Sequence, residues 1–196
     1  SNAMLAMKIS FINEIAVMSD HYGVDIENVR KGIGADPRIG SEFIYPGCGY
    51  GGSCFPKDTA AMEKMARVAG LDSNIFGAVL KRNEMQQELL VQKILQYFNG
   101  NISGKKFAVW GLAFKPDTDD VRCASSLKVI RGIYREGAQI VAYDPQAENR
   151  AAKELADLKV EYAENQYKAI ENADALILVT EWREFRQPDF SRLKKS

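Results

Sequence analysis

The spacing of apolar residues divides the chain into two halves with different periods. In the first half Leu5, Ile9, Ile12 and Ala16 recur every three or four positions, which is typical of a helix with one buried face. Capping residues such as Asp25 and stopping glycines mark the ends of further periodic stretches. The pattern predicts four helices, over residues 5–23, 26–34, 59–69 and 74–98.

In the second half short apolar runs alternate with helical stretches. The runs predict strands over residues 106–111, 139–143, 160–162 and 175–180. Helices are predicted between them, over residues 124–136, 149–158 and 167–172. Strands that alternate with helices indicate βαβ units on a parallel sheet. The fold class is therefore α/β: an all-helical domain over 1–88, a linking helix end and turn over 89–103, and a Rossmann-like parallel-sheet domain over 104–196.

Composition narrows the classes of partner. Of the 196 residues, 46% are hydrophobic and 27% charged, which is ordinary for a soluble globular protein. The net charge is zero, so no overall field favours nucleic acid or an anionic membrane. No apolar run approaches the ~18 residues that span a bilayer. We expect neither nucleic acid nor membrane as a partner.

The cysteine and histidine counts argue against disulfides and metal. Three cysteines are an odd number, and the one histidine, His21, excludes a multi-histidine metal site. A reducing cytoplasm is the simplest setting, and Cys48 and Cys123 are interpreted as packing residues. The residues Ser1-Asn2-Ala3 before Met4 resemble the remnant of an expression tag and are given no role.

The stretch FIYPGCGYGGSCFPKD, residues 43–58, contains a G-x-G-x-x-G match from Gly47 to Gly52. A dinucleotide loop needs a strand before it and a helix that opens inside it. Here Pro46 precedes the first glycine and helices lie upstream. The strand at 107–110 has the proper context but offers only Gly111. Neither half therefore carries a complete dinucleotide fingerprint.

The glycines can instead serve Cys54. Glycine lets backbone N–H groups approach a ligand closely. Lys57 and a helix predicted to begin after Asp58 place positive charge near the sulfur, which suits a reactive cysteine. We expect Asp58 to cap that helix and to orient a water or a proton. The spacing leaves open the alternative of a small packed cysteine in a tight turn.

The loop motif and five further segments extend this pattern into a family resemblance. The loop motif G-x-G-x-G-G-S-C-F-P-K-D resembles the active-site signature of the UDP-glucose/GDP-mannose dehydrogenase family. The segments NAMLAMKISFINEIA and DPRIG resemble the central helix of that family and the turn before its loop. VWGLAFKPDTDDVR, AYDP and LILVTEWREF resemble strands and loops of its C-terminal domain. The resemblance covers nearly the whole chain and implies a central helical dimerisation domain followed by a nucleotide-sugar-binding domain.

The resemblance implies a reaction for the cysteine. In the family an alcohol is oxidised twice to a carboxylate, and two NAD molecules are consumed. A thiolate captures the intermediate aldehyde as a thiohemiacetal, which is oxidised to a thioester and then hydrolysed. Cys54 would be this nucleophile, and Asp58 would handle the water and the proton.

The resemblance also implies binding residues. Those expected to contact substrate are Arg38, Phe43, Tyr45, Gly47, Gly49, Tyr50, Gly51, Phe114 and Lys115. Arg122 and Lys57 are expected to contact NAD. Arg38 resembles a residue that reaches the substrate of a neighbouring subunit, which implies a homodimer through the helical domain. Read without the resemblance, the aromatic residues could be core residues, and the basic residues solvated charges.

The family's N-terminal NAD-binding domain has no counterpart in this sequence. We therefore expect a fragment of a UDP-glucose 6-dehydrogenase, which forms UDP-glucuronate, and we expect this chain alone not to reduce NAD. The alternatives are a dehydrogenase of another nucleotide sugar, such as UDP-N-acetylmannosamine or GDP-mannose, and a non-catalytic dimerisation and nucleotide-sugar-binding module. A thiol oxidoreductase unrelated to sugars is disfavoured by the absence of a CxxC pair.

Overall fold

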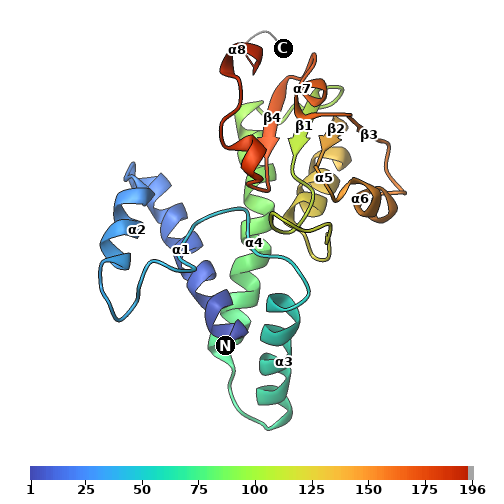
Figure 1. Cartoon of the computed structure of the whole chain (residues 1–196). Coiled ribbons are helices and arrows are strands. Elements are labelled where there is room, and N and C mark those ends of the chain that lie inside the picture. Colours follow the sequence, from blue (N-terminus) through green and yellow to red (C-terminus); the bar gives the residue numbers. More distant parts are fainter. Residues whose placement is uncertain (194–196) are drawn as a thin grey trace. The chain divides into compact units, whose positions relative to one another are not determined.

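The structure is a computed structural model that describes residues 1–193. It divides into two compact units, Ser1–Gln87 and Glu88–Ser196 (Figure 1). The first unit is helical and the second combines helices with a sheet. This is the α/β fold class that the two periodicities predict.

Four helices form the first unit: α1 (Asn2–Tyr22), α2 (Ile26–Gly34), α3 (Phe55–Val68) and the first part of α4 (Asn74–Tyr97). α1 ends at Gly23, which has φ of +65°, a conformation that glycine adopts without steric cost. α2 begins at Asp25, whose carboxylate accepts a hydrogen bond from the Glu27 N–H at 2.9 Å. Both ends lie where the sequence predicts them.

The start of α3 differs from the sequence prediction. The helix begins at Phe55, with Cys54 as its N-cap residue, so Asp58 is not the cap but lies one turn inside. The Asp58 N–H donates to the Cys54 carbonyl at 2.8 Å, which closes the first helical turn. Pro56 fits this turn, because the first N–H groups of a helix have no partner within it.

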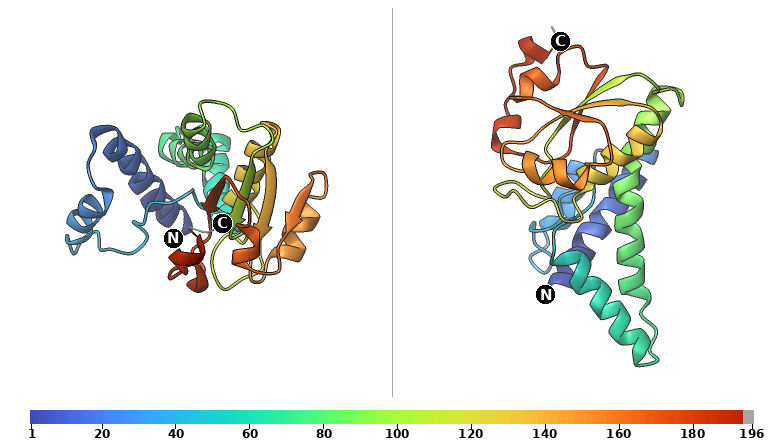
Figure 2. Two further views of the ribbon diagram at one scale, coloured as in Figure 1. Left: turned by 90° about the horizontal axis from the view of Figure 1, so that it is seen from above. Right: turned by 90° about the vertical axis from the view of Figure 1, so that its right-hand side faces the viewer.

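The second unit is built on four parallel strands. They are β1 (Lys106–Trp110), β2 (Gln139–Tyr143), β3 (Val160–Tyr162) and β4 (Ala175–Leu178), in the spatial order β3-β2-β1-β4 (Figure 2). The connecting segments are α5 (Ser125–Arg135), α6 (Glu148–Glu154) and α7 (Gln166–Ala169). The 3₁₀ turn η1 (Arg183–Phe185) and α8 (Phe190–Leu193) follow β4. The order reverses between β1 and β4, and the loops after these two strands flank the place where such sheets commonly bind ligands.

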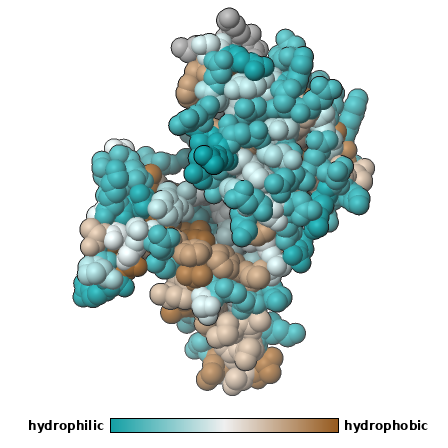
Figure 3. All heavy atoms as spheres, in the orientation of Figure 1, coloured by the Kyte–Doolittle hydropathy of each residue, from teal (hydrophilic) through white to brown (hydrophobic). Residues whose placement is uncertain are grey.

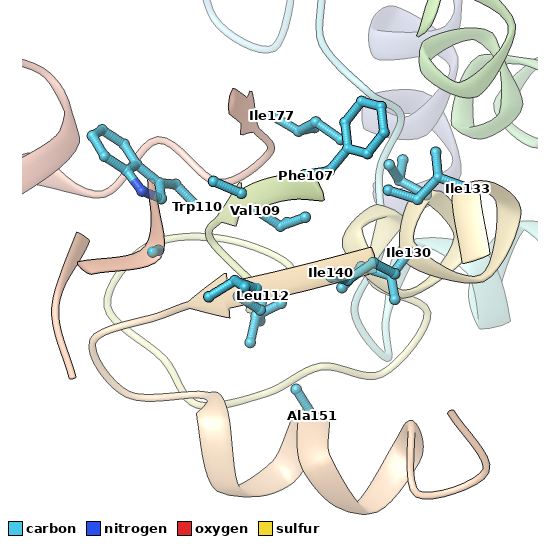
Figure 4. Close-up of a cluster of buried hydrophobic side chains, with 14 of the residues drawn as sticks. Phe107, Val109, Trp110, Leu112, Ile130, Ile133, Ile140, Ala151 and Ile177 are labelled. Carbon is cyan, nitrogen blue, oxygen red and sulfur yellow. The ribbon is translucent and has the colours of Figure 1, made fainter. Parts of the chain in front are cut away.

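The core of the second unit lies between the sheet and its helices (Figure 4). Phe107 of β1 and Ile130 and Ile133 of α5 are fully buried in it, and Ile130 lies beside Ile140 of β2. The Trp110 ring stacks on Phe185 at a centroid distance of 5.1 Å, and its indole N–H donates to the Gln166 carbonyl at 2.9 Å. This apolar core fixes the strands, and the loops that follow the strands start from these fixed positions.

The apolar core of the first unit is smaller. Ala6, Tyr50 and Val79 form its buried centre. Apolar side chains remain exposed where α3 leads into α4 (Figure 3, brown), among them Met65, Val68, Leu71 and Ile75. The buried residues of this unit also include four side-chain amides, and these amides hold the cysteine loop.

Candidate active site

The first turn of α3 (Figure 1) carries three chemically active groups. Cys54 is exposed at the N-terminus of this 14-residue helix, and its sulfur lies 3.7 Å from the Ser53 hydroxyl. Asp58 accepts a hydrogen bond at Oδ2 from the Asn2 side-chain amide at 2.6 Å. The Lys57 Nζ lies 3.7 Å from Asp58 Oδ1. A thiol, an oriented carboxylate and an ammonium group therefore share one helix start, where unpaired N–H groups concentrate partial positive charge.

Four buried amide side chains hold the loop that leads to Cys54. Asn83 makes two hydrogen bonds with the Tyr50 backbone: its Oδ1 accepts from the N–H at 2.8 Å and its Nδ2 donates to the carbonyl at 3.0 Å. Gln87 Nε2 also donates to the Tyr50 carbonyl, at 3.2 Å. Asn13 Oδ1 accepts from the Gly47 N–H at 2.8 Å, and Gln86 Nε2 donates to the Gly47 carbonyl at 2.6 Å. We call Asn13, Asn83, Gln86 and Gln87 the amide clamp.

The amide clamp explains one of the glycines. Gly49 has φ of +93°, and a Cβ at this position would lie 2.9 Å from both Asn83 Oδ1 and Gln87 Cγ. The residue must therefore be glycine for two reasons, its backbone conformation and the closeness of the clamp. Sequence analysis did not single out the clamp. Its only signal is that Asn83, Gln86 and Gln87 share one helix face, since they are spaced by three and four positions.

Tyr50 is part of the core rather than of the open surface. It is 7% exposed, and its ring packs edge-on against Phe55 at 5.9 Å. Burial raises the pKa of the Tyr50 phenol, an effect that the nearby Thr59 and Ser10 hydroxyls partly oppose. In this structure Tyr50 anchors the loop through its backbone and ring, and its contact with substrate stays a prediction.

The other expected substrate residues of the first unit lie nearer the surface. The exposed Arg38 pairs with Asp36 at 2.6 Å and lowers the pKa of that carboxyl. The Phe43 ring lies 6.1 Å from the Phe55 ring, and the Tyr45 ring lies 4.4 Å beneath the Arg30 guanidinium. Gly47 and Gly51 belong to the clamped loop itself. The structure brings Phe43 to the start of α3 and pairs Tyr45 with α2.

In the second unit, the expected residues Phe114, Lys115 and Arg122 share the loop that follows β1. The Phe114 N–H donates to the Asp120 carbonyl at 2.9 Å, which closes the loop. The exposed Lys115 Nζ lies 5.6 Å from the centre of the Phe114 ring. Arg122 contacts both Asp120 carboxylate oxygens, with a shortest distance of 2.6 Å, and lowers the pKa of that acid. An aromatic ring and a positive charge thus stand together at the end of β1.

The same loop does not fit a dinucleotide in the Rossmann manner. A Cβ at Gly111 would lie 2.5 Å from Thr180 Cβ, so the space beside this glycine is filled by the chain itself. Asp144, which follows β2 where dinucleotide folds place a ribose-binding acid, is 3% exposed and bonded to the backbone of the protein. The residues around the β1 loop therefore do not form a dinucleotide-binding site for NAD.

Two further classes of site are absent from residues 1–193. No group of three or more His, Cys, Asp or Glu side chains in this range is placed to hold a metal ion. Within the same range, no helix combines the length and the apolar content that a membrane crossing requires.

Comparisons with known proteins match both units. Residues 1–85 match the model of the UDP-glucose/GDP-mannose dehydrogenase family, central domain. Residues 108–196 match that of the UDP binding domain of the same family. A UDP-glucose 6-dehydrogenase from Pseudomonas aeruginosa is 49% identical over the whole chain, and one from Rhizobium meliloti is 43% identical.

Solved structures agree with these sequence matches. A UDP-glucose dehydrogenase from Pyrobaculum islandicum aligns over 97% of this chain with a TM-score of 0.91 and 38% identity, and 44% of that protein is covered. A UDP-D-ManNAc dehydrogenase from Pyrococcus horikoshii aligns over the whole chain with a TM-score of 0.82 and 27% identity, covering 43% of that protein. The chain spans 44% of the length of each of the two bacterial relatives. On the two domain matches and these identities, the chain belongs to the UDP-glucose/GDP-mannose dehydrogenase family.

Proposed function

We propose that this chain supplies the nucleophile and the nucleotide-sugar-binding domain of an NAD-dependent dehydrogenase that oxidises UDP-glucose to UDP-glucuronate. The observation that carries the proposal is the first turn of α3, where Cys54 is exposed and Asp58 lies one turn away. The two bacterial relatives are both UDP-glucose 6-dehydrogenases, which supports the choice of UDP-glucose.

In this proposal Cys54 retains the substrate between two oxidations. The first hydride transfer converts the C6 alcohol into an aldehyde. The Cys54 sulfur adds to the aldehyde carbon, and the resulting thiohemiacetal keeps one carbon-bound hydride to lose. Loss of that hydride leaves a thioester, and water cleaves it to the carboxylate and the free thiol.

Asp58 acts on the water in the last step. Its carboxylate accepts a proton from the attacking water, and Lys57 Nζ lies 3.7 Å from its Oδ1. When bound, NAD would supply the hydride acceptor for both oxidations. Lys57 and Arg122 are the residues of this chain that we propose contact NAD. The backbone of the β1 loop is not proposed to bind it.

The proposed sugar-nucleotide contacts lie on two loops. Lys115 offers a point charge to a phosphate, and the adjacent Phe114 offers an apolar face. In the first unit Phe43 and Tyr45 are proposed to flank the sugar, and the clamped backbone from Gly47 to Gly51 supplies polar groups to it. Arg38 is proposed to reach the substrate of a second subunit.

The second subunit is proposed to dock on the helical unit as a homodimer. Met4, Phe11, Met18 and Tyr22 are all exposed along α1, at spacings of seven, seven and four residues, which places them on one helix face. Phe11→Glu should convert a dimer into a monomer in light scattering. The same change at the exposed Tyr97 should leave the mass unchanged. A wild-type chain that is monomeric at high concentration would contradict the dimer.

Calorimetric titration with UDP-glucose tests substrate binding, with GDP-mannose and UDP-N-acetylglucosamine as competitors. We expect selective binding of UDP-glucose, and a loss of about tenfold in affinity for Lys115→Ala because a phosphate contact is removed. The matched control is Lys153→Ala, which removes an exposed lysine of α6. Preference for another nucleotide sugar would overturn the substrate assignment, and binding to none of them would overturn the binding function.

Alkylation by iodoacetamide, followed by peptide mass spectrometry, tests the nucleophile. Cys54 should react faster than the half-buried Cys48 and than Cys123, which is also exposed. Cys54→Ser should remove the fast phase and leave the other two rates unchanged. Equal rates at Cys54 and Cys123 would mean that the start of α3 does not activate the sulfur. Fast reaction in a chain that binds no nucleotide sugar would instead favour a thiol oxidoreductase.

A further inference from the structure

The backbone of residues 111–114, which follows β1, is held entirely by the protein itself. The Gly111 N–H donates to the Tyr143 carbonyl at 2.9 Å, and the Leu112 and Ala113 N–H groups donate to Asp144 Oδ2 at 2.6 and 3.0 Å. The Phe114 N–H donates to the Asp120 carbonyl. Each of the four N–H groups therefore points to an acceptor within the second unit, and none is left for a ligand.

The carbonyl side of this segment is held in the same way. The Ser126 hydroxyl donates to the Leu112 carbonyl at 2.6 Å, and the Thr180 hydroxyl donates to the Ala113 carbonyl at 2.6 Å. Thr180 also fills the space beside Gly111. The segment is thus fixed from the start of α5 on one side and from the end of β4 on the other.

Asp144 is the centre of this arrangement. Its carboxylate accepts five hydrogen bonds, from the N–H groups of Leu112, Ala113, Gln146 and Ala147 and from the Trp182 indole, at distances between 2.6 and 3.0 Å. Five donors are enough to use all the lone pairs that a carboxylate offers. No cation is among them, so the negative charge is stabilised by N–H dipoles alone.

This is the pattern that a bound phosphate makes in nucleotide-binding folds. There the loop after the first strand turns its N–H groups to the phosphate, and glycine gives the phosphate room. Here the N–H groups turn to a carboxylate of the protein, and Thr180 takes the room beside the glycine. An internal anion occupies the place of a ligand anion.

We propose that Asp144 is a positioning residue that substitutes for a ligand phosphate and fixes the β1 loop, so that Phe114 and Lys115 meet the nucleotide sugar. The inference rests on the proposed function for the identity of the ligand. The diphosphate is then bound by Lys115 beyond the loop, and not by the backbone of residues 111–113.

Asp144→Asn is the direct test, because it keeps the shape and replaces one acceptor oxygen by a donor that faces N–H groups. We expect UDP affinity, measured by calorimetry, to fall at least tenfold. The matched control is Asp157→Asn, which breaks only the surface pair with Arg131. Its UDP affinity should stay within twofold of wild type. A folded Asp144→Asn chain that binds UDP as tightly as wild type overturns the proposal.

Amide NMR in the absence of ligand gives a readout that does not depend on binding. In Asp144→Asn the Leu112 and Ala113 amide protons and the Trp182 indole proton should move upfield, because their charged acceptor is lost. If that variant does not fold, Ser126→Ala is the alternative, because it removes only the hydrogen bond from the Ser126 hydroxyl to the Leu112 carbonyl. This variant should stay folded and bind UDP about threefold more weakly.

The outcomes separate this inference from the proposed function. A wild-type chain that binds no UDP refutes the binding function, and the NMR shifts then decide alone whether Asp144 orders the loop. If the shifts are unchanged in folded Asp144→Asn, or if Ser126→Ala binds UDP as wild type does, the positioning role is wrong.

Discussion

Asn83 gives the sharpest test of how the cysteine loop is held. Asn83→Ala removes both hydrogen bonds to the Tyr50 backbone, at 2.8 and 3.0 Å, without changing the loop sequence. The Tyr50 carbonyl keeps the donor from Gln87 at 3.2 Å. The buried Tyr50 N–H, in contrast, loses the acceptor that the structure gives it.

The two losses have different magnitudes. A hydrogen bond whose remaining partner is still satisfied contributes about 1 kcal/mol to the free energy of unfolding, whereas a buried donor left unsatisfied costs about 1–3 kcal/mol. The sum for Asn83→Ala is therefore about 2–4 kcal/mol. At least half of this cost falls on the Tyr50 N–H, because the carbonyl retains Gln87.

Chemical denaturation and amide hydrogen exchange measure this cost. The free energy of unfolding of the first unit should fall by about 2–4 kcal/mol, and peptides covering residues 47–52 should lose protection. Asn74→Ala makes the same substitution at the exposed start of the same helix, and should change stability by less than about 0.5 kcal/mol. If Asn83→Ala is as stable as Asn74→Ala and the loop stays protected, the amide clamp does not hold the loop.

Three other perturbations have defined outcomes. Gly49→Ala should lower the melting temperature of the first unit, because its Cβ would lie 2.9 Å from two clamp residues at φ of +93°; Gly77→Ala, with open space around it, should raise it slightly. Gly111→Ala should destabilise the second unit more than Gly104→Ala. Both positions have positive φ, but only at position 111 would the added Cβ clash with Thr180. Burial, with a contribution from Glu184, raises the pKa of Tyr143 to about 12. The contribution of the neutral Tyr143 phenol to the free energy of unfolding is therefore complete below pH ~10 and is lost as the pH rises toward 12. In alkaline denaturation Tyr143→Phe should show a shallower decline.

Each of these has a result that would count against it. Equal melting temperatures for Gly49→Ala and Gly77→Ala would mean that the loop can move away from the clamp. Equal effects at Gly111 and Gly104 would assign the whole cost to backbone conformation rather than to Thr180. An unchanged slope above pH 10 in Tyr143→Phe would show that other groups govern the alkaline transition.

Helix and strand identity was predictable because it depends on neighbours along the chain. The Asp25 cap and the Gly23 stop involve residues within a few positions of each other, and both lie where the pattern predicts. The start of α3 was misplaced, since Asp58 is as good a capping type as any residue nearby. Pro56 within the first turn was the local signal that favoured the earlier start.

The candidate nucleophile was also visible in the sequence. Cys54 stands in a glycine-rich loop before a helix, and the structure places it exposed at the first turn of α3. Its supporting residues were not visible. Asn83 and Asp144 are polar residues in the sequence; the spacing of Asn83 and the AYDP segment around Asp144 do not show that either side chain is buried.

The sequence by itself determined the periodicities, the parallel sheet and the motifs that carry the family resemblance, because these follow from local spacing. Only the tertiary structure decided that Tyr50 is buried, that amides clamp its backbone, and that the Asp144 carboxylate accepts five hydrogen bonds from the protein. The partners in those contacts lie 33 residues apart for Asn83 and Tyr50 and 32 apart for Asp144 and Leu112. A buried polar group is stable only where such a distant partner arrives, and that is a property of the folded chain.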